Sequence, residues 1–317
     1  MKVLLTGGAG FAGRHLSAML SARGHEVFIA DRFDPASADA SHLVLYLENE
    51  ESIRTVLQTV KPDCIIHLAA QSSVAQSWKT PESTLEVNII GSVRLLQVAA
   101  QLTPECRFVF IGSGEEYGVD CSEERPFTEE SVCRPHNPYA VSKFAAGQML
   151  ELLALRYSMR FVHLRPFNHF GPFQREGFVV ADFCAQVARA EAGSGSRGPD
   201  GEWTIRVGNL EAKRDFLFVD DVMKAYCLMA EAEQYPHPVY NISTGTVHPV
   251  RYILDYLVSQ AKVGIRVEID PAKFRPVEVP ALIASNELIY KDFGWRPETS
   301  LEDGLLKNLN WWRENVR

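Results

Sequence analysis

Short apolar runs alternate with longer amphipathic stretches through the first half of the chain. The runs have the length and the polar or glycine-rich flanks of buried strands, and they fall at residues 2–6, 26–30, 42–47, 64–68, 107–111 and 160–164. Between them, apolar residues recur at helical spacing in stretches that end near residue 23 or cover residues 52–60, 81–101 and 138–157. Strands and helices that alternate in this way predict an α/β fold built on a doubly wound parallel sheet.

The pattern changes after residue 165. A helix ending near residue 192 is followed by a polar, glycine-rich segment at 193–201, which predicts a surface loop. Further helices are predicted at 219–231, 250–261 and 301–315, and further strands at 203–207, 239–242 and 266–269. We therefore divide the chain into a first domain, 1–165, and a smaller lobe, 166–317, that is partly interleaved with the first.

Composition limits the class of protein. The 317 residues are 46% hydrophobic, which is enough for a packed core, and the net charge of −8 argues against general nucleic-acid binding. The six cysteines are scattered, with no C-x-x-C pair and no spacing that indicates a metal site. We therefore expect free thiols, no metal and a cytoplasmic location. We also expect neither a signal peptide nor a membrane span, because every apolar run is too short.

A glycine pattern follows the first strand directly. Gly7, Gly10 and Gly13 stand between that strand and an amphipathic helix. Glycines in this place permit a tight turn, close approach of the backbone to phosphate and close packing of helix on strand. The N-terminus of the helix then offers free N–H groups and a favourable dipole to a pyrophosphate. The sequence predicts that residues 1–165 form a Rossmann domain that binds a dinucleotide.

The residues after the second strand bear on the choice of dinucleotide. Asp31 ends that strand about 20 residues beyond the glycines, where a carboxylate can bind the ribose hydroxyls of the adenosine. A carboxylate there would repel the 2′-phosphate of NADP, so NAD(H) is favoured. Arg32 could pair with that phosphate and leaves NADP(H) open.

A tyrosine and a lysine are the candidate acid–base pair. Tyr139 and Lys143 stand one turn apart on a helix that Asn137 and Pro138 suit as its first residues. A free tyrosine has a pKa of about 10, but a nearby ammonium favours the phenolate and lowers that pKa. The pair can then move a proton to or from an alcohol or ketone oxygen. Ser113 follows the fifth strand, at the sheet edge where ligands bind, and its hydroxyl can hold the same oxygen.

These motifs together resemble a known family. Thr6-Gly7-x-x-Gly10-x-x-Gly13 with Ser113, Tyr139 and Lys143 is similar to the extended short-chain dehydrogenase/reductases of the nucleotide-sugar epimerase/dehydratase family, and the resemblance covers essentially the whole chain. Further stretches resemble the GDP-hexose branch of this family, and within it the members that reduce GDP-4-keto-6-deoxy-D-mannose. These stretches are 115–118 (EEYG), 165–169 (RPFNH), 177–178 (GF), 208–215 (GNLEAKRD), 275–279 (RPVEV) and 284–286 (ASN).

The resemblance implies a cofactor site along the strand ends. Its predicted residues are Gly7, Gly10, Phe11, Ala12, Gly13, Asp31, Arg32, Leu47, Leu68, Ala69, Ala70, Asn88, Tyr139, Lys143 and Pro166. The small residues after the fourth strand would let a cofactor lie close, whereas His67, inside that apolar strand, is better explained as a core histidine. Tyr46 departs from the family, because many members have an aspartate there that contacts adenine.

The resemblance also implies a GDP-sugar substrate bound mainly by the lobe at 166–317. Its predicted residues are Ser72, Ser73, Asn168, Arg214, Arg275 and Glu278. The two arginines would clamp the diphosphate, because a guanidinium binds phosphate oxygens bidentately. Glu278 would hold the nucleotide ribose. An alternative interpretation of Arg214 is a surface ion pair, for example with Asp215.

The reaction implied is reduction by NAD(P)H of the 4-keto group of a GDP-4-keto-6-deoxyhexose, as in synthesis of GDP-6-deoxy-D-mannose or GDP-rhamnose. The main alternative is a GDP-mannose 4,6-dehydratase or a related 4-epimerase, and Glu115 lies where dehydratases carry the base for the C5 proton. A non-catalytic protein that senses dinucleotides is a further alternative, against which the intact Ser113, Tyr139 and Lys143 argue. Family members commonly pair through two long helices, here 81–101 and 138–157, so a homodimer is expected.

Overall fold

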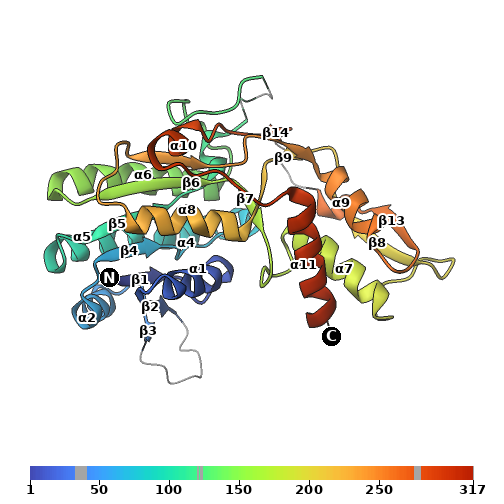
Figure 1. The fold of residues 1–317 in the computed structure, drawn as a ribbon, viewed down its shortest axis with the longest axis horizontal. Coiled ribbons are helices and arrows are strands. Elements are labelled where there is room, and N and C mark those ends of the chain that lie inside the picture. The colour runs from blue at the N-terminus through green and yellow to red at the C-terminus, as the bar shows by residue number, and fades with distance from the viewer. Residues whose placement is uncertain (33–40, 120, 122–123, 275–279, 317) are drawn as a thin grey trace.

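A seven-stranded parallel sheet forms the centre of the computed structural model, which describes residues 1–32, 41–119, 121, 124–274 and 280–316 (Figure 1). The strand order is β11-β6-β5-β4-β1-β2-β3, and every neighbouring pair is parallel. The strands are β1 (Lys2–Thr6), β2 (Glu26–Asp31), β3 (His42–Val44), β4 (Cys64–His67), β5 (Arg107–Ile111), β6 (Phe161–Pro166) and β11 (Val239–Ile242). The predicted doubly wound α/β fold is confirmed.

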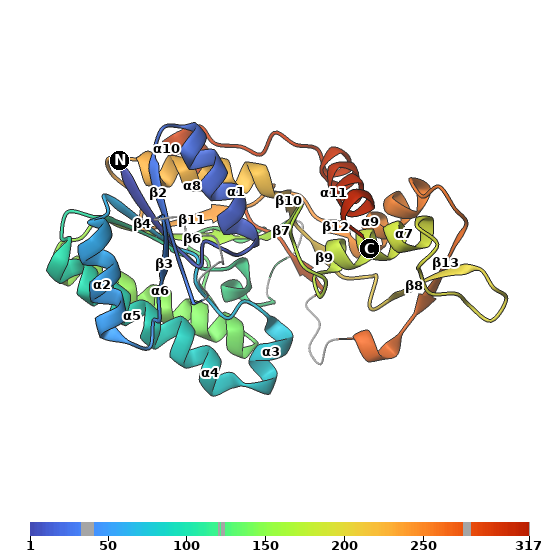
Figure 2. The ribbon, with the colours of Figure 1, turned by 90° about the horizontal axis from the view of Figure 1, so that it is seen from below.

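Helices cover both faces of this sheet (Figure 2). One face carries α1 (Phe11–Ala22) and α8 (Val219–Glu231), and the other carries α2 (Glu50–Val60), α5 (Ser92–Leu102) and α6 (Pro138–Tyr157). The alternation of side chains along a strand serves both layers. Val3 and Leu5 of β1 belong to the core beneath α1 and α8, whereas Leu4 belongs to the core beneath α2, α5 and α6. The inner strands β1, β4, β5 and β6 are thus buried on both sides, as their sequences predict, whereas β2 and β3 are only partly buried.

The second lobe lies beyond the carboxyl ends of the large sheet, on the right of Figure 1. Its helices are α7 (Val179–Glu191), α9 (Val250–Ser259) and α11 (Leu301–Asn315). Three small sheets join it: β8 (Trp203–Val207) with β13 (Ile265–Ile269); β7 (Asn168–Phe170) with β10 (Phe216–Phe218); and β9 (Lys213–Arg214) between β12 (His248–Pro249) and β14 (Ala281–Leu282).

The chain returns from this lobe to the large sheet. After the second lobe has begun, α8 packs on the face beside α1, and β11 adds the edge strand next to β6. Helix α10 (Glu287–Phe293) then lies against β11. The large sheet therefore contains residues from both sides of residue 166.

Several predicted elements differ from those observed. The strand predicted at 42–47 ends at Val44, and the helix predicted at 81–101 is divided into α4 (Pro81–Leu85), a π-helix (Glu86–Gly91) and α5. A short helix, α3 (Val74–Lys79), precedes it and was not predicted. The π-turn lies where the buried Asn88 side chain bonds residues of two other elements, which helical periodicity in the sequence does not show.

Two predictions from composition can be compared with the structure. All six cysteines are free thiols, as predicted, and Cys64, Cys106, Cys184 and Cys227 are buried. No helix in the described part of the chain is both long and apolar enough to cross a membrane.

Candidate active site

The glycine turn between β1 and α1 has the shape of a dinucleotide cradle. Gly7 has φ +70°, and a Cβ there would lie 2.7 Å from the backbone of Ala69 after β4. A Cβ at Gly13 would lie 2.3 Å from the Gly8 carbonyl oxygen. Gly10 is the N-cap of α1. Because glycine has no side chain, the first N–H groups of the helix have no side-chain cap. These residues fit a bound pyrophosphate, because only glycines permit this backbone and the helix N-terminus favours an anion.

Asp31 lies at the end of β2 beside this turn. Its carboxylate accepts hydrogen bonds from the N–H of Ala9 at 3.2 Å and from the N–H of Arg32 at 2.8 Å. The aspartate therefore braces the glycine turn. The Arg32 side chain is exposed, and its Nη2 lies 3.6 Å from Oε2 of Glu48. The predicted contact of Asp31 with a ribose stays a prediction.

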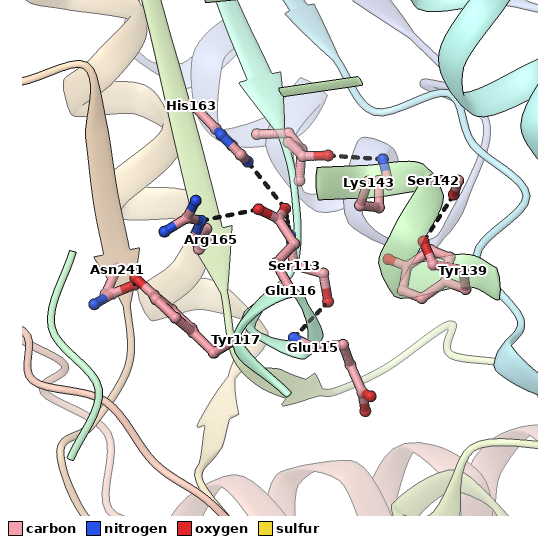
Figure 3. A network of polar contacts seen from close by, with 11 residues as sticks. Ser113, Glu115, Glu116, Tyr117, Tyr139, Ser142, Lys143, His163, Arg165 and Asn241 are labelled. Atoms are coloured by element: carbon pink, nitrogen blue, oxygen red, sulfur yellow. Dashed lines mark hydrogen bonds and ion pairs between the residues drawn. The ribbon is translucent and has the colours of Figure 1, made fainter. Parts of the chain in front are cut away.

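The three proposed catalytic side chains come from two neighbouring elements (Figure 3). Ser113 follows β5 directly, and Tyr139 and Lys143 lie on the first turns of α6. The Asn137 side chain caps that helix by accepting a hydrogen bond from the N–H of Ala140 at 2.8 Å, as predicted. The predicted meeting of these three residues at the carboxyl edge of the sheet is therefore observed.

The protonation of the pair differs from expectation. Burial raises the pKa of the Tyr139 phenol, and its hydrogen bond with Ser113 offsets only part of that effect. Lys143 does not lower it, because its Nζ donates to the carbonyl oxygen of Ile111 at 2.7 Å and lies over the Phe110 ring. The expectation that Lys143 lowers the tyrosine pKa is wrong in this structure. Burial instead lowers the pKa of Lys143 to about 8.

Glu115 lies next to this pair. Its Oε2 accepts a hydrogen bond from Nδ2 of Asn137 at 3.1 Å and lies 3.7 Å from Nε2 of His136. The side chain is only 12% exposed. A carboxylate is thus held at the N-terminus of the helix that carries Tyr139.

The other predicted cofactor residues line the same edge in different ways. Leu47 and Pro166 are buried, whereas Phe11, Ala12, Leu68, Ala69 and Ala70 are half-buried around the glycine turn. Asn88 is buried, and it binds the backbone of Gln71 and donates to the Ser142 hydroxyl at 2.8 Å. This asparagine therefore ties the loop after β4 to α6, whether or not it also contacts a cofactor.

The predicted substrate residues are spread over both lobes. Ser72 is exposed after β4, and Ser73 caps α3. Asn168 begins β7. Arg214 lies in β9. Arg275 and Glu278 lie outside the described residues, so their predicted roles stay predictions.

The surface ion pair suggested for Arg214 is not what the structure shows. Arg214 is 6% exposed and Asp215 only 1%. The Asp215 carboxylate accepts hydrogen bonds from the N–H and hydroxyl of Thr244 and from the N–H of Gly245. Burial raises the pKa of this aspartate to about 7 despite these bonds. Both side chains are therefore buried, and the alternative of a surface ion pair is wrong.

His67 behaves as a core residue. Its Nδ1 lies 2.6 Å from the Thr6 hydroxyl and its Nε2 lies 2.8 Å from the Ser92 hydroxyl. Burial and the nearby Lys143 lower its pKa to about 3, so the ring is neutral. The interpretation of His67 as a satisfied core histidine is confirmed.

Comparison with known proteins agrees with this geometry. Residues 4–307 match the family model described as GDP-mannose 4,6 dehydratase. This chain belongs to that family. The predicted membership of the nucleotide-sugar short-chain dehydrogenase/reductases is confirmed, and with it the assignment as an enzyme.

The chain is similar over its full length to relatives whose names give different activities. The chain is 32% identical to GDP-6-deoxy-D-mannose reductase of Pseudomonas aeruginosa, across 100% of this chain and 98% of that one. It is 29% identical to GDP-mannose 4,6-dehydratase of Vibrio cholerae, across 95% and 91% of the two chains. The structure of RMD from P. aeruginosa complexed with NADPH superposes with a TM-score of 0.84 at 30% identity, covering 99% and 98%. That of Thermus thermophilus UDP-glucose 4-epimerase with NAD gives 0.87 at 28% identity and covers both chains in full.

One buried residue of this family member was missed as part of the site. Glu116 follows Glu115, and its side chain is completely buried beneath Ser113. The signal that could have found it is the Ser113-x-x-Glu116 spacing, which is that of a capping box. In the structure this capping box is formed. The Glu116 carboxylate accepts a hydrogen bond from the N–H of Ser113, and the Ser113 hydroxyl oxygen accepts one from the N–H of Glu115.

Proposed function

We propose that the protein reduces the 4-keto group of a GDP-4-keto-6-deoxyhexose with a nicotinamide dinucleotide. The observation that carries this proposal is the full-length similarity to GDP-6-deoxy-D-mannose reductase, at 32% identity over 317 residues. Ser113, Tyr139 and Lys143 at one sheet edge supply the groups that such a reduction requires.

Each of these residues has a distinct task. The Tyr139 phenol donates its proton to the C4 oxygen as negative charge develops there, and the Ser113 hydroxyl donates a hydrogen bond to the same oxygen. Lys143 would hold the nicotinamide ribose, and it is not assigned the stabilisation of the phenolate because its Nζ is bonded to the Ile111 carbonyl oxygen. The bound cofactor supplies the hydride. Burial that raises the pKa of Tyr139 suits the reductive direction, because it keeps the phenol protonated until the oxygen needs its proton.

The cofactor is held at the glycine turn. The cradle at Gly7, Gly10 and Gly13 would take the pyrophosphate, and Asp31 would take the adenosine ribose. We propose NAD(H) as the favoured cofactor because of Asp31, with NADP(H) as the alternative. Support for the alternative comes from the P. aeruginosa RMD structure, which holds NADPH, and from the exposed Arg32 side chain.

The substrate side is assigned to the second lobe. Arg214, whose guanidinium is buried, and Arg275 would bind the diphosphate, while Glu278 would bind the nucleotide ribose. Asn168, Ser72 and Ser73 would contact the sugar or the diphosphate. A cytoplasmic location also stays a prediction.

A second candidate is 4,6-dehydration of a GDP-hexose. The observation in its favour is the Glu115 carboxylate, which Asn137 holds at the start of the catalytic helix. In that reaction Glu115 would remove the C5 proton after oxidation at C4. Gly114, which separates Glu115 from Ser113, offers no acid beside it.

One assay separates these activities. The protein is given GDP-mannose or GDP-4-keto-6-deoxymannose with NADH or NADPH, and both the reduced cofactor and the sugar products are followed. Consumption of reduced cofactor only with the keto sugar is expected. Conversion of GDP-mannose without net change in the cofactor would establish the dehydratase instead, and no turnover of either sugar would favour a non-catalytic role.

We further propose a homodimer formed by α6 and the α4–α5 segment. Leu152 and Leu155 on α6 are 63% and 80% exposed, and Met149 on the same helix is also exposed. Large apolar side chains that gather on two neighbouring helices are typical of an interface. Light scattering at low micromolar concentration should give a dimer, and Leu152→Glu with Leu155→Glu should give a monomer. A monomeric wild-type protein would contradict this.

A further inference from the structure

The buried carboxylate of Glu116 joins two chain segments beneath the catalytic serine (Figure 3). Its Oε1 accepts hydrogen bonds from the N–H of Ser113 at 2.9 Å and from Nε2 of His163 at 3.0 Å. Its Oε2 accepts from Nε of Arg165 at 2.9 Å. His163 and Arg165 come from β6, so one carboxylate connects the Ser113 turn with the neighbouring strand.

Further contacts make this arrangement rigid. The Arg165 guanidinium lies 4.7 Å from the centre of the Tyr117 ring, and the Tyr117 hydroxyl donates to Oδ1 of Asn241 in β11 at 2.8 Å. The N–H of Asn241 in turn donates to Oε1 of Glu129 at 2.8 Å. The Glu116 carboxylate cannot rotate away from Ser113 without breaking its buried hydrogen bonds with Ser113, His163 and Arg165.

Two glycines show how closely the network approaches the catalytic helix. A Cβ at Gly112, just before Ser113, would lie 2.1 Å from Nε2 of His163 and 2.3 Å from Oε1 of Glu116. A Cβ at Gly147, one helical turn after Lys143, would lie 2.4 Å from Cε1 of His163. The imidazole is therefore clamped between the end of β5 and α6.

The charges of the network can be assigned. Burial raises the pKa of the Glu116 carboxyl, but His163, Arg165 and the Ser113 N–H together bring it below its ordinary value. The carboxylate is therefore ionised at neutral pH. Nδ1 of His163 is buried and has no hydrogen-bond partner among the described residues.

The same carboxylate and Lys143 bind the end of one strand: Lys143 Nζ donates to the Ile111 carbonyl oxygen at 2.7 Å, and Glu116 accepts from the N–H of Ser113, two residues later, at 2.9 Å. Burial lowers the pKa of Lys143 to about 8, and the negative charge of Glu116 opposes this effect. The other titratable groups near Lys143 are His67, which is neutral because its pKa is lowered to about 3, and Tyr139, whose raised pKa keeps it uncharged. Glu116 is thus the buried anion that favours the ammonium form.

We propose that Glu116 is a positioning residue of the active site, which fixes the Ser113 turn through its backbone N–H and places a negative charge at the end of β5 to which the Lys143 ammonium is bound. This role of Glu116 rests on the proposed reduction, because Ser113 has a catalytic task only in that reaction. The effect on Lys143 does not depend on which sugar is turned over, since the lysine also holds the nicotinamide ribose.

The test is the pH dependence of cofactor binding, measured by the fluorescence of bound NADH or NADPH in wild type and in Glu116→Gln. Binding should weaken as Lys143 loses its proton, and the midpoint should lie at lower pH in Glu116→Gln. Glu129→Gln is the matched control, because this acid belongs to the same network but contacts neither Ser113 nor Lys143, and its midpoint should equal that of wild type. An unchanged midpoint in folded Glu116→Gln overturns the proposal.

Steady-state rates test the serine turn separately. Glu116→Asp keeps the charge but shortens the reach to Ser113, so kcat should fall by about tenfold while the midpoint for cofactor binding stays that of wild type. If Glu116→Gln does not fold because Arg165 is left unpaired, Glu116→Gln with Arg165→Met removes both charges and should show the same lowered midpoint. A wild-type protein that turns over no keto sugar would refute the proposed function, yet the binding midpoints would still decide the role of Glu116.

Discussion

The cofactor edge of the large sheet and the substrate side of the second lobe are built by different means. At the cofactor edge, backbone lies on backbone: a Cβ at Gly7 would clash with the main chain of Ala69 after β4, and a Cβ at Gly13 would clash with the main chain of Gly8 in the same turn. On the substrate side, Arg214 is placed by β9, a two-residue strand between two other two-residue strands. The glycines of the cofactor edge therefore leave almost no room for a larger side chain. The substrate side depends on a few backbone bonds and on the side chains themselves, which is suited to a lobe that differs with the substrate.

The largest effect should come from adding a single methyl group at the cofactor edge. Gly13→Ala places a Cβ 2.3 Å from the Gly8 carbonyl oxygen, so the turn must move, and we expect a loss of about 3 kcal/mol in the free energy of unfolding together with loss of cofactor binding. Chemical denaturation and NADH fluorescence measure the two. Gly264→Ala is the control, because its Cβ would meet no atom within 4 Å, and it should change stability by less than about 0.5 kcal/mol. Equal stability of the two variants would contradict the close packing.

An intermediate effect is expected from removing one hydroxyl at the same edge. Tyr139→Phe keeps the half-buried ring but removes the proton donor, so kcat should fall by about 10²-fold or more while the Kd of the cofactor stays within about twofold. Single-turnover rates with saturating cofactor would measure this. Turnover at the wild-type rate would exclude Tyr139 as the donor.

The smallest effect should come from the substrate side. Arg214→Ala should raise the KM of the GDP-sugar by roughly tenfold or more, because a charge-assisted pair with the diphosphate is lost, and it should leave cofactor binding unchanged. The same direction is expected for Arg275→Ala. Arg266→Ala is the control in the same lobe, since its guanidinium is half exposed and pairs with Asp200 at 2.8 Å. If Arg214→Ala weakens sugar and cofactor equally, the two regions are not separate in function.

The same contrast explains what the sequence could and could not predict. The large sheet was predictable because each apolar strand is followed by its own glycine, acid or small-residue turn, and Ser113, Tyr139 and Lys143 take their places from those local signals. The β9, β12 and β14 pairing was not predictable, since two residues carry no periodicity. Their partners lie far apart along the chain.

Buried polar residues escaped prediction for a related reason. Asn88 shapes a π-turn by bonding Gln71 and Ser142, and Glu116 reaches His163 and Arg165 from a separate strand. A sequence shows an asparagine or a glutamate but not the partners that make its burial favourable. The lowering of the Tyr139 pKa was predicted wrongly on the same ground, because the distance from Lys143 to the phenol depends on where the Ile111 carbonyl lies.

The late arrival of β11 at the large sheet has a consequence for synthesis of the protein on the ribosome. Strand β6 ends at Pro166, but its neighbour β11 begins only at Val239. At about 5–20 residues per second, a ribosome needs on the order of ten seconds to make the chain between them. During that time the catalytic residues have been made while β6 still has an open edge, which is a site for pairing with other nascent chains. The edge of β6 is therefore closed only once β11 has been made and has paired with it.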